Sequence, residues 1–382
     1  MKILVLQDHL RSGGTERQSV LLANAFAAAG HGTTLLTFRP DGALASTVAP
    51  GVARHALQRF DTGLDWFAPR LTCTIARAQP DIVLCLGRMA NCHAHRIVGA
   101  LRDRQLHAAV VATMRTGKKL PWLFRLSLRR VGHVVANSHD ARATLLRDYA
   151  VPAEKISVIH NSLVLSPPAA GAVERSDPTT RERLRAQQGA TPATAVLLCV
   201  AMFRPEKNQR ELIEIAAGLP PATDWQLWLV GDGPARAACE QLIAEKNLSA
   251  RVKFLGFQRD PSALYAAADI AVHASWSEAL SNFIIEAQAN GLPAVAYEAQ
   301  GIRECFMPDR TGWAIARDDR EAFRATLVRL MQDSSATREA RAADACDYAR
   351  HTFDPARQVQ AYLELFERLT RSAQLHDCQT DL

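Results

Sequence analysis

Residues 3–18 read Ile-Leu-Val-Leu-Gln-Asp-His-Leu-Arg-Ser-Gly-Gly-Thr-Glu-Arg-Gln, an unbroken apolar run followed by a glycine-containing turn and the start of a helical pattern. Comparable apolar runs recur at 82–84, 109–112 and 134–136, each followed by a turn and a helical pattern. Strands that are apolar at every position, rather than at alternate positions, are typical of a parallel sheet with helices on both faces. We therefore expect the N-terminal part of the chain to be a doubly wound α/β domain.

A second domain of the same kind is predicted after an interruption. The apolar pattern stops in the Pro/Ala/Gly stretch at 166–171 and gives way to a charged, helix-like segment. It resumes in further apolar runs at 195–201, 227–230, 252–255, 269–272 and 294–296. The predicted organisation is an N-terminal domain at 1–165, a linker at 166–190, a C-terminal domain at 191–355 and a final helix at 356–382.

The expected architecture is a pair of Rossmann-like domains that face a central cleft. In open parallel sheets, ligands bind at the carboxyl ends of the strands, near the point where the strand order reverses. Binding and catalytic residues are therefore expected in the loops that follow the strands.

The bulk composition is that of an ordinary globular protein. The 382 residues are 48% hydrophobic and 22% charged, and a chain of this length favours two or more domains. No apolar run approaches the roughly 20 residues that cross a bilayer, and no signal peptide is evident. The eight cysteines show neither C-x-x-C pairs nor a zinc-like His/Cys spacing. We expect a reduced cytoplasmic protein without a structural metal.

The two halves of the chain carry opposite net charge. Residues 1–190 contain 25 Lys and Arg against 13 Asp and Glu, a balance of +12, whereas residues 191–382 contain 20 against 26, a balance of −6. A basic half favours an anionic partner. Nucleic acid is not the expected partner, because aromatic residues are only 6% and no known nucleic-acid-reading element is evident.

Three loops are candidate binding sites for a phosphate-bearing ligand. Gly13 and Gly14 precede a helix start at which backbone amides and the helix dipole favour an anion, although a tight turn without a ligand fits this pair equally well. Arg204 and Lys207 follow a predicted strand and suit a diphosphate, with a solvated basic turn as the alternative. The turn Gly231-Asp232-Gly233-Pro234 lacks the third glycine of a dinucleotide fingerprint and is interpreted as structural.

Glu278 and Glu286 flank the start of a predicted helix. The buried strand at 269–273 leads into a loop and then a helix over 283–290, which puts Glu278 in the loop and Glu286 in the first helical turns. Backbone N–H groups at the helix start can hold phosphate oxygens. We expect the two carboxylates to accept hydrogen bonds from hydroxyls of a sugar nucleotide, because as plain surface charges they would repel its phosphates.

Together these motifs resemble the family 4 glycosyltransferases of the GT-B fold, from residue 1 to about 367. The resemblance rests on Gly13-Gly14-x-Glu16, Val135-Ala136-Asn137-Ser138, Val158-Ile159-His160-Asn161-Ser162, Arg204-x-x-Lys207-Asn208, Val230-Gly231-Asp232-Gly233-Pro234 and the E-x7-E element from Glu278 to Glu286. It implies retaining transfer of a sugar from a nucleotide-diphosphate donor, above all a UDP-sugar, with no cofactor and no catalytic metal. In line with this, no D-x-D-like cluster follows a predicted strand.

The resemblance also implies roles for individual residues of this chain. The resemblance implies that Arg204 and Lys207 neutralise the donor diphosphate, that Glu286 binds the ribose and that Glu278 binds hydroxyls of the donor sugar. It further implies that the backbone of Leu280, Ser281 and Asn282 forms a phosphate cradle and that Gly14, with its neighbour Gly13, covers this cradle from the other domain. Phe257 is implied to lie beside the base.

Other segments fit the family less closely or allow two interpretations. Residues 160–162 and 299–304 depart from the commoner family pattern, which leaves the identity of the donor sugar open. Phe353-Asp354-Pro355 and the helical pattern after it resemble the family's segment that crosses back to the first domain. A helix that completes the second domain is the alternative.

On the acceptor side, the N-terminal domain offers a histidine and a basic segment. His93 is a candidate base for the acceptor hydroxyl, with Asp8 and His9 as similar candidates, although a loop histidine is more often structural. Residues 115–130 contain six basic residues, no acid, and interleaved Trp, Phe and Leu, which suits peripheral contact with an anionic membrane. The alternative is a helix whose apolar face covers the sheet.

The predicted function is sugar transfer to a glycan or lipid-linked acceptor in cell-envelope polysaccharide or lipopolysaccharide biosynthesis. The alternatives are a sugar-nucleotide epimerase of the same fold and a non-catalytic two-domain sugar-nucleotide-binding protein. The E-x7-E element together with Arg204 and Lys207 favours the transferase over the epimerase. A secreted solute-binding protein would need an export signal, and none is evident.

Overall fold

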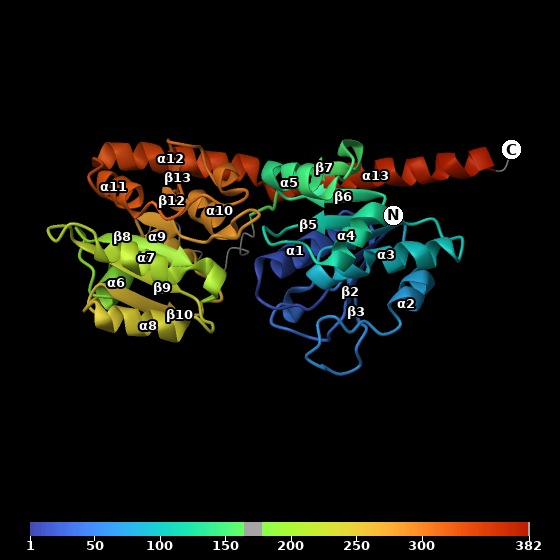
Figure 1. Ribbon diagram of the computed structural model, residues 1–382, viewed down its shortest axis with the longest axis horizontal. Helices are drawn as coiled ribbons and strands as arrows, with labels where there is room; N and C mark the ends of the chain where they lie inside the picture. Colours follow the sequence, from blue (N-terminus) through green and yellow to red (C-terminus); the bar gives the residue numbers. More distant parts are fainter. Residues whose placement is uncertain (164–177, 381–382) are drawn as a thin grey trace. The chain divides into compact units, whose positions relative to one another are not determined.

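The computed structural model describes residues 1–163 and 178–380, which fall into two compact units (Figure 1). Unit 1 contains the described residues before 164 together with the helix that begins at Pro355. Unit 2 contains the described residues from Pro178 to Asp354. Each unit is built on one parallel sheet with helices packed on it, so the predicted doubly wound α/β fold is confirmed for both parts of the chain.

The sheet of unit 1 has seven strands in the order β3-β2-β1-β4-β5-β6-β7, and every neighbouring pair is parallel. The strands are β1 (Lys2–Gln7), β2 (Gly32–Thr37), β3 (Ala53–Ala56), β4 (Ile82–Cys85), β5 (Ala109–Met114), β6 (His133–Ala136) and β7 (Ile156–Val158). The strand order reverses between β1 and β4. The loops after these two strands therefore diverge, which is where ligands bind in such sheets.

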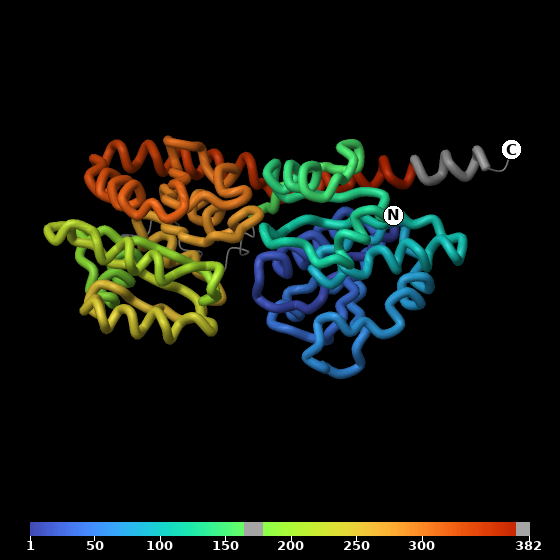
Figure 2. Tube along the Cα trace, in the orientation of Figure 1, coloured from blue at the N-terminus to red at the C-terminus, as the bar shows by residue number. Residues whose placement is uncertain are grey.

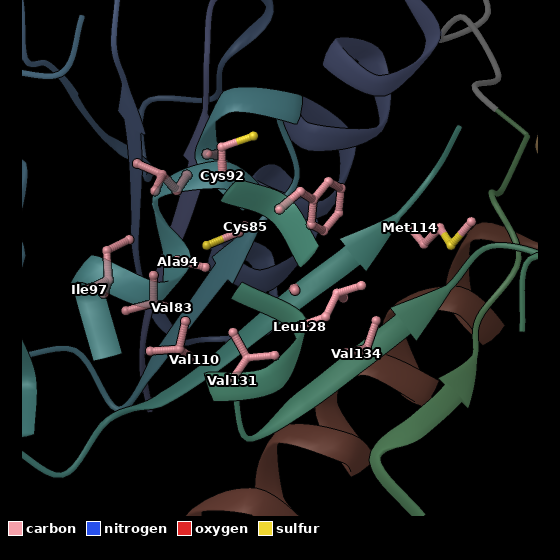
Figure 3. Close-up of a cluster of buried hydrophobic side chains, with 14 of the residues drawn as sticks. Val83, Cys85, Cys92, Ala94, Ile97, Val110, Met114, Leu128, Val131 and Val134 are labelled. Atoms are coloured by element: carbon pink, nitrogen blue, oxygen red, sulfur yellow. The ribbon is translucent and has the colours of Figure 1, made fainter. Parts of the chain in front are cut away.

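Both faces of this sheet are covered because its central strands are apolar on both sides. Ile3 and Val5 join a core with α1 (Gly14–Ala28) and α13 (Pro355–Thr380), whereas Leu4 and Leu6 point to the opposite core. The helices on that opposite side are α2 (Leu71–Ala78), α3 (Arg88–Arg102), α4 (Trp122–Arg130) and α5 (His139–Tyr149). Figure 3 shows part of this second core, in which Ile97 of α3 and Leu128 of α4 lie over the strands.

The sheet of unit 2 has six parallel strands in the order β10-β9-β8-β11-β12-β13, and its order reverses between β8 and β11. The strands are β8 (Ala195–Val200), β9 (Trp225–Val230), β10 (Val252–Gly256), β11 (Ile270–His273), β12 (Ala294–Tyr297) and β13 (Gly312–Ile315). The helices are α6 (Pro178–Gln187), α7 (Gln209–Ala217), α8 (Arg236–Glu245), α9 (Ser262–Ala267), α10 (Asn282–Ala289), α11 (Arg320–Met331) and α12 (Ser335–Thr352).

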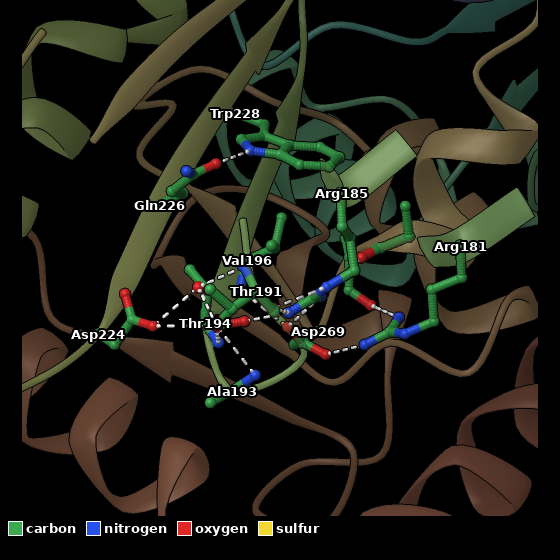
Figure 4. A network of polar contacts seen from close by, with 12 residues as sticks. Arg181, Arg185, Thr191, Ala193, Thr194, Val196, Asp224, Gln226, Trp228 and Asp269 are labelled. Atoms are coloured by element: carbon green, nitrogen blue, oxygen red, sulfur yellow. Dashed lines mark hydrogen bonds and ion pairs between the residues drawn. The ribbon is translucent and has the colours of Figure 1, made fainter. Parts of the chain in front are cut away.

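The second half of the predicted linker at 166–190 belongs to unit 2. Residues 166–177 lie outside the described residues, but α6 is held to the rest of the unit by two arginines (Figure 4). Arg181 and Arg185 bind the two carboxylate oxygens of Asp269 at 2.5 and 3.0 Å. Arg185 is almost fully buried, and a buried arginine needs such partners. The linker prediction was therefore wrong for 178–187, which form a helix of unit 2. The sequence did not reveal these contacts because they join segments more than 80 residues apart.

The C-terminal helix α13 belongs to unit 1 and contributes to its core. In Figure 2 it is the red helix that runs past the green segment of this unit. Tyr362 and Phe366 are buried against Phe26 of α1, and their ring centroids lie 6.2 and 5.6 Å from that of Phe26. The Tyr362 hydroxyl accepts a hydrogen bond of 2.9 Å from Arg115, which follows β5. The helix therefore covers a face of the unit 1 sheet that would otherwise expose apolar side chains to water.

Replacing Phe366 by alanine is expected to lower the free energy of unfolding of unit 1 by about 3–5 kcal/mol, because the change leaves a cavity between α13 and α1. The measurement is denaturant unfolding followed by circular dichroism. Glu367→Ala is the matched control, since Glu367 is exposed on the same helix and its loss should change stability by less than about 0.5 kcal/mol. Equal stability of the two variants would contradict the placement of this helix in the core.

Candidate active site

In unit 2 the loops after the two central strands β8 and β11 lie against each other. The turn after β8 contains a short 3-10 helix, Pro205–Lys207, and the backbone N–H of Trp276 donates to the carbonyl of Glu206 in that turn at 3.2 Å. The Ser275 hydroxyl donates to the same carbonyl at 2.9 Å. These bonds fix the position of Lys207 relative to the loop that carries Glu278.

Glu278 is a buried carboxylate with two partners on one oxygen. Its Oε1 lies 2.5 Å from Nζ of Lys207 and 2.8 Å from Nε2 of His273, and its residue is 9% exposed. Burial alone would raise the pKa of Glu278, but the charge of Lys207 and the hydrogen bond from His273 outweigh it and lower the pKa to about 2. The carboxylate therefore stays ionised near neutral pH and acts as a hydrogen-bond acceptor, not as an acid.

Glu286 lies one turn into α10 and is also held by a neighbour. The Tyr265 hydroxyl, from α9, donates to Oε2 of Glu286 at 2.8 Å, and the Tyr265 ring stacks on Phe283 with centroids 6.3 Å apart. At the start of α10, the Ser281 hydroxyl accepts a hydrogen bond from the N–H of Ile284. Leu280 and Ser281 are buried, whereas Asn282 is half-buried.

Arg204 and Phe257 are more exposed than the two carboxylates. Arg204 lies at the beginning of the turn after β8, and it has no ion-pair partner among the residues that the structure describes. Phe257 follows β10 and is 57% exposed, which is unusual for a phenylalanine. Both residues lie just beyond the carboxyl ends of their strands, on the same edge of the sheet as Lys207 and Glu278.

The turn at 231–234 is structural, in agreement with its interpretation from the sequence. The N–H of Phe203 donates to Asp232 and the N–H of Gly231 donates to Gly256, so the turn links the ends of β8, β9 and β10. Gly231 has a φ of 131°, and a Cβ there would lie 2.1 Å from the carbonyl oxygen of Ala201. Only glycine fits such a close approach.

The glycine pair of unit 1 starts α1 as expected. Gly13 is the N-cap and Gly14 is the first residue of the helix, and Gly14 is exposed. The buried Gln18 side chain donates to the carbonyl of Ser162 at 2.7 Å and also bonds to Gln358 of α13. The role of both glycines at a phosphate stays a prediction, because it concerns a ligand that unit 2 would bind.

The structure gives Asp8 and His93 structural partners. Asp8 accepts hydrogen bonds from the backbone N–H groups of Met89 and Ala90 at 2.9 and 2.7 Å and so caps α3. Nε2 of His93 lies 3.2 Å from the carbonyl of Trp66, and Nδ1 lies 3.3 Å from Arg96. Burial and the charge of Arg96 lower the pKa of His93. Both ring nitrogens of His93 therefore have a neighbour in this structure, and its role as a base stays a prediction.

The basic segment at 115–130 covers the sheet of unit 1. Phe124 and Leu128 of α4 are buried in the core, whereas Trp122 at the start of the helix is 71% exposed. Arg115 is bound to Asn161 and to Tyr362 inside the unit. The apolar face of α4 is therefore occupied, which favours the sheet-covering alternative. Within 1–163 and 178–380, no helix has the length and apolarity that a membrane span requires.

His273 and Tyr265 are the site residues that the sequence did not reveal. His273 ends the apolar strand β11, and a polar residue at the last position of such a strand is a signal that could have been noticed. Tyr265 gives no local signal, because it is 21 residues from Glu286 and reaches it only through packing of α9.

Two family models match the chain along most of its length. Residues 12–166 match Glycosyltransferase Family 4, and residues 180–348 match Glycosyl transferases group 1. The chain belongs to the family 4 glycosyltransferases. The predicted resemblance is therefore confirmed, and the two matches fall on the two units.

Curated relatives of this glycosyltransferase include proteins of lipopolysaccharide synthesis. It is 34% identical over 146 residues to the lipopolysaccharide core biosynthesis glycosyltransferase LpsE of Rhizobium meliloti, which covers 38% of this chain and 42% of LpsE. It is 32% identical over 179 residues to LpsD of the same organism, which covers 47% of this chain and 51% of LpsD. The chain thus spans about half the length of the curated relatives it matches. Neither relative supports the epimerase alternative.

Solved structures confirm the GT-B fold of this glycosyltransferase. Anabaena HepE in complex with UDP-glucose has a TM-score of 0.79 and 24% identity over 96% of this chain and 100% of HepE. WaaG, a glycosyltransferase involved in lipopolysaccharide biosynthesis, has a TM-score of 0.72 and 19% identity over 96% of this chain and 99% of WaaG. At these identities the likeness concerns the fold alone.

Replacing Gly231 by alanine is expected to lower the free energy of unfolding by more than about 2 kcal/mol, because the new Cβ meets the Ala201 carbonyl and the backbone angle disfavours any side chain. The matched control is Gly99→Ala in the interior of α3, where no atom lies within 4 Å of the added carbon. That change should stabilise the protein by about 0.5–1 kcal/mol. Thermal unfolding of both variants measures the contrast, and a similar effect of the two changes would contradict it.

The pH dependence of stability is expected to show the titration of Asp8. Burial raises the pKa of Asp8 to about 6, above its ordinary 3.8, so the folded state holds this proton more tightly than the unfolded state. The stabilisation from protonated Asp8 is complete below about pH 4 and is lost as the pH rises through 6. The difference in unfolding free energy between wild type and Asp8→Asn should therefore fall by on the order of 1–3 kcal/mol from pH 4 to 7. A difference that is independent of pH would show that Asp8 has an ordinary pKa.

Proposed function

We propose that this protein is a retaining glycosyltransferase that takes a sugar from a nucleotide-diphosphate donor, above all a UDP-sugar, and transfers it to a glycan or lipid-linked acceptor. The observation that carries the proposal is the ion pair between Lys207 and the buried Glu278, beside the exposed Arg204. At this edge of the parallel sheet, Arg204 and Lys207 are two cations suited to a diphosphate, and the ionised Glu278 is an acceptor for hydrogen bonds from sugar hydroxyls.

In the proposed reaction, the bond between the anomeric carbon and the diphosphate oxygen breaks, and its electron pair leaves with the diphosphate. Arg204 and Lys207 stabilise the charge that develops on this leaving group, so the transfer needs no divalent cation. The acceptor oxygen forms the new bond and gives up its proton. Because both ring nitrogens of His93 are engaged, we assign this proton to an oxygen of the departing diphosphate.

The remaining donor contacts follow from the placement of each residue. Ionised Glu278 accepts a hydrogen bond from a hydroxyl of the donor sugar, and Glu286, oriented by Tyr265, accepts from the ribose. Backbone N–H groups around Leu280, Ser281 and Asn282 bind phosphate oxygens at the start of α10. The exposed ring of Phe257 lies beside the base. A contribution of Gly13 and Gly14 to the phosphate contacts stays a prediction from the sequence.

The cellular role that we propose is cell-envelope polysaccharide or lipopolysaccharide synthesis from the cytoplasmic side. The likeness to LpsE and LpsD supports the pathway, and UDP-glucose, which is bound in the HepE complex, is the donor that we propose to test first. Peripheral contact with an anionic membrane would have to use Trp122 and the exposed basic residues near it, since the apolar face of α4 is buried.

A thermal-shift screen against UDP, GDP, ADP and their sugar conjugates tests the proposal. A nucleotide diphosphate that binds the folded state at 100 times its Kd should stabilise wild type by about 2.7 kcal/mol. The shift should disappear in Arg204→Ala/Lys207→Ala, because both cations of the diphosphate site are lost. The control is Arg338→Ala/Arg350→Ala, which removes the same charge from exposed positions on α12. A shift that survives in the first double variant would exclude the proposed diphosphate site.

A further inference from the structure

His273 is a polar residue at a position where burial favours an apolar one. It is 1% exposed and follows Ile270, Ala271 and Val272 in β11, all of which are buried. Its Nδ1 is enclosed and has no hydrogen-bond partner among the residues that the structure describes. A buried nitrogen without a partner destabilises the fold, and an aliphatic side chain would avoid that loss. A function that needs the other ring nitrogen would explain why a histidine is present.

The other ring nitrogen donates to Glu278. Nε2 lies 2.8 Å from Oε1, and because a carboxylate only accepts hydrogen bonds, Nε2 must carry a proton. The ring is held at one side by Phe283, with centroids 5.7 Å apart. Its position is fixed further by the backbone of β11, which is paired with β12 at this residue.

The two oxygens of Glu278 have different surroundings as a result. Oε1 receives both the His273 proton and a proton of Lys207. Oε2 receives no hydrogen bond from any residue that the structure describes, and it is not fully enclosed. Lysine is a point charge on a flexible stem and could follow a rotating carboxylate, whereas the imidazole is rigid and directional.

We propose that His273 is a positioning residue that locks Oε1 of Glu278 and so presents Oε2 to the donor sugar. This inference rests on the proposed function, in which Glu278 binds a sugar hydroxyl. A site with one fixed acceptor oxygen requires a hydroxyl at the matching position and discriminates against a donor that lacks it. His273 thereby contributes to donor specificity without touching the donor.

Two amide substitutions separate this role from a general effect on packing. In His273→Gln the amide nitrogen reaches the position of Nε2 and can donate to Glu278. In His273→Asn the amide reaches only the position of Nδ1, where there is no partner. Both variants bury a neutral amide in place of the ring, so their thermal stabilities serve as the control for folding.

The first measurement needs no donor and uses the ¹H–¹⁵N spectrum of the histidine rings in the full-length protein. We expect a proton on Nε2 of His273 at neutral pH and a displaced Nε2 resonance in Glu278→Gln. A ring protonated only at Nδ1 would overturn the proposal, because such a ring cannot donate to the carboxylate. An Nε2 resonance that is unchanged in Glu278→Gln would overturn it as well.

The second measurement compares UDP binding by calorimetry with turnover of UDP-glucose. We expect His273→Asn to lower kcat/KM by at least about tenfold while the Kd for UDP changes less than about twofold, and we expect His273→Gln to recover most of the loss. Equal effects of Asn and Gln, or full activity of Asn, would overturn the inference. If Glu278→Gln kept full turnover, the proposed role of Glu278 itself would fail, whereas an inactive Glu278→Gln beside a fully active His273→Asn would refute only the role of His273.

Discussion

Parallel strand pairing is the constraint on which this protein is built. Each strand delivers its carboxyl end to the same edge of its sheet, so loops that are far apart in sequence meet there. In unit 2 this brings Lys207, after β8, to Glu278, after β11, across 71 residues of chain. The crowding at this edge is possible because Gly231 and Gly301 allow backbone approaches that any Cβ would block. In the proposed function, the same edge serves both the packing of the turns and the binding of the donor.

Charge balance at that edge explains why the candidate site is stable before a ligand arrives. A carboxylate buried as deeply as Glu278 would hold its proton if it were alone, and Lys207 together with His273 reverses this preference. Removing one member of such a group leaves the others buried without a partner, which is more harmful than never having the group. The same three charged or polar groups therefore stabilise the loop and set the electrostatic potential that a diphosphate sugar would meet.

Several features of the fold and the site could be predicted from the sequence, and the failures have physical causes. The continuous apolar runs predicted β1, β4, β5 and β6 of one sheet and β8 to β12 of the other, and the spacing from Arg204 to Lys207 and from Glu278 to Glu286 predicted the loops that meet in unit 2. The apolar runs did not predict β2, β3, β7 and β13, because these strands are short or contain polar residues. The linker was placed too far along the chain because the ion pairs of α6 with Asp269 have no local signature. The sequence also did not reveal that Arg96 and the Trp66 carbonyl lie beside the ring nitrogens of His93.

By itself the sequence determined two doubly wound units, the glycine turns and the charged residues at strand ends, because apolar periodicity and turn chemistry act over a few neighbouring residues. Only the tertiary structure decided that α13 completes unit 1, that Tyr265 holds Glu286, and that His273 shares one oxygen of Glu278 with Lys207. These contacts depend on which side chains lie close together in space. The sequence does not reveal them because the residues come from segments that are far apart along the chain.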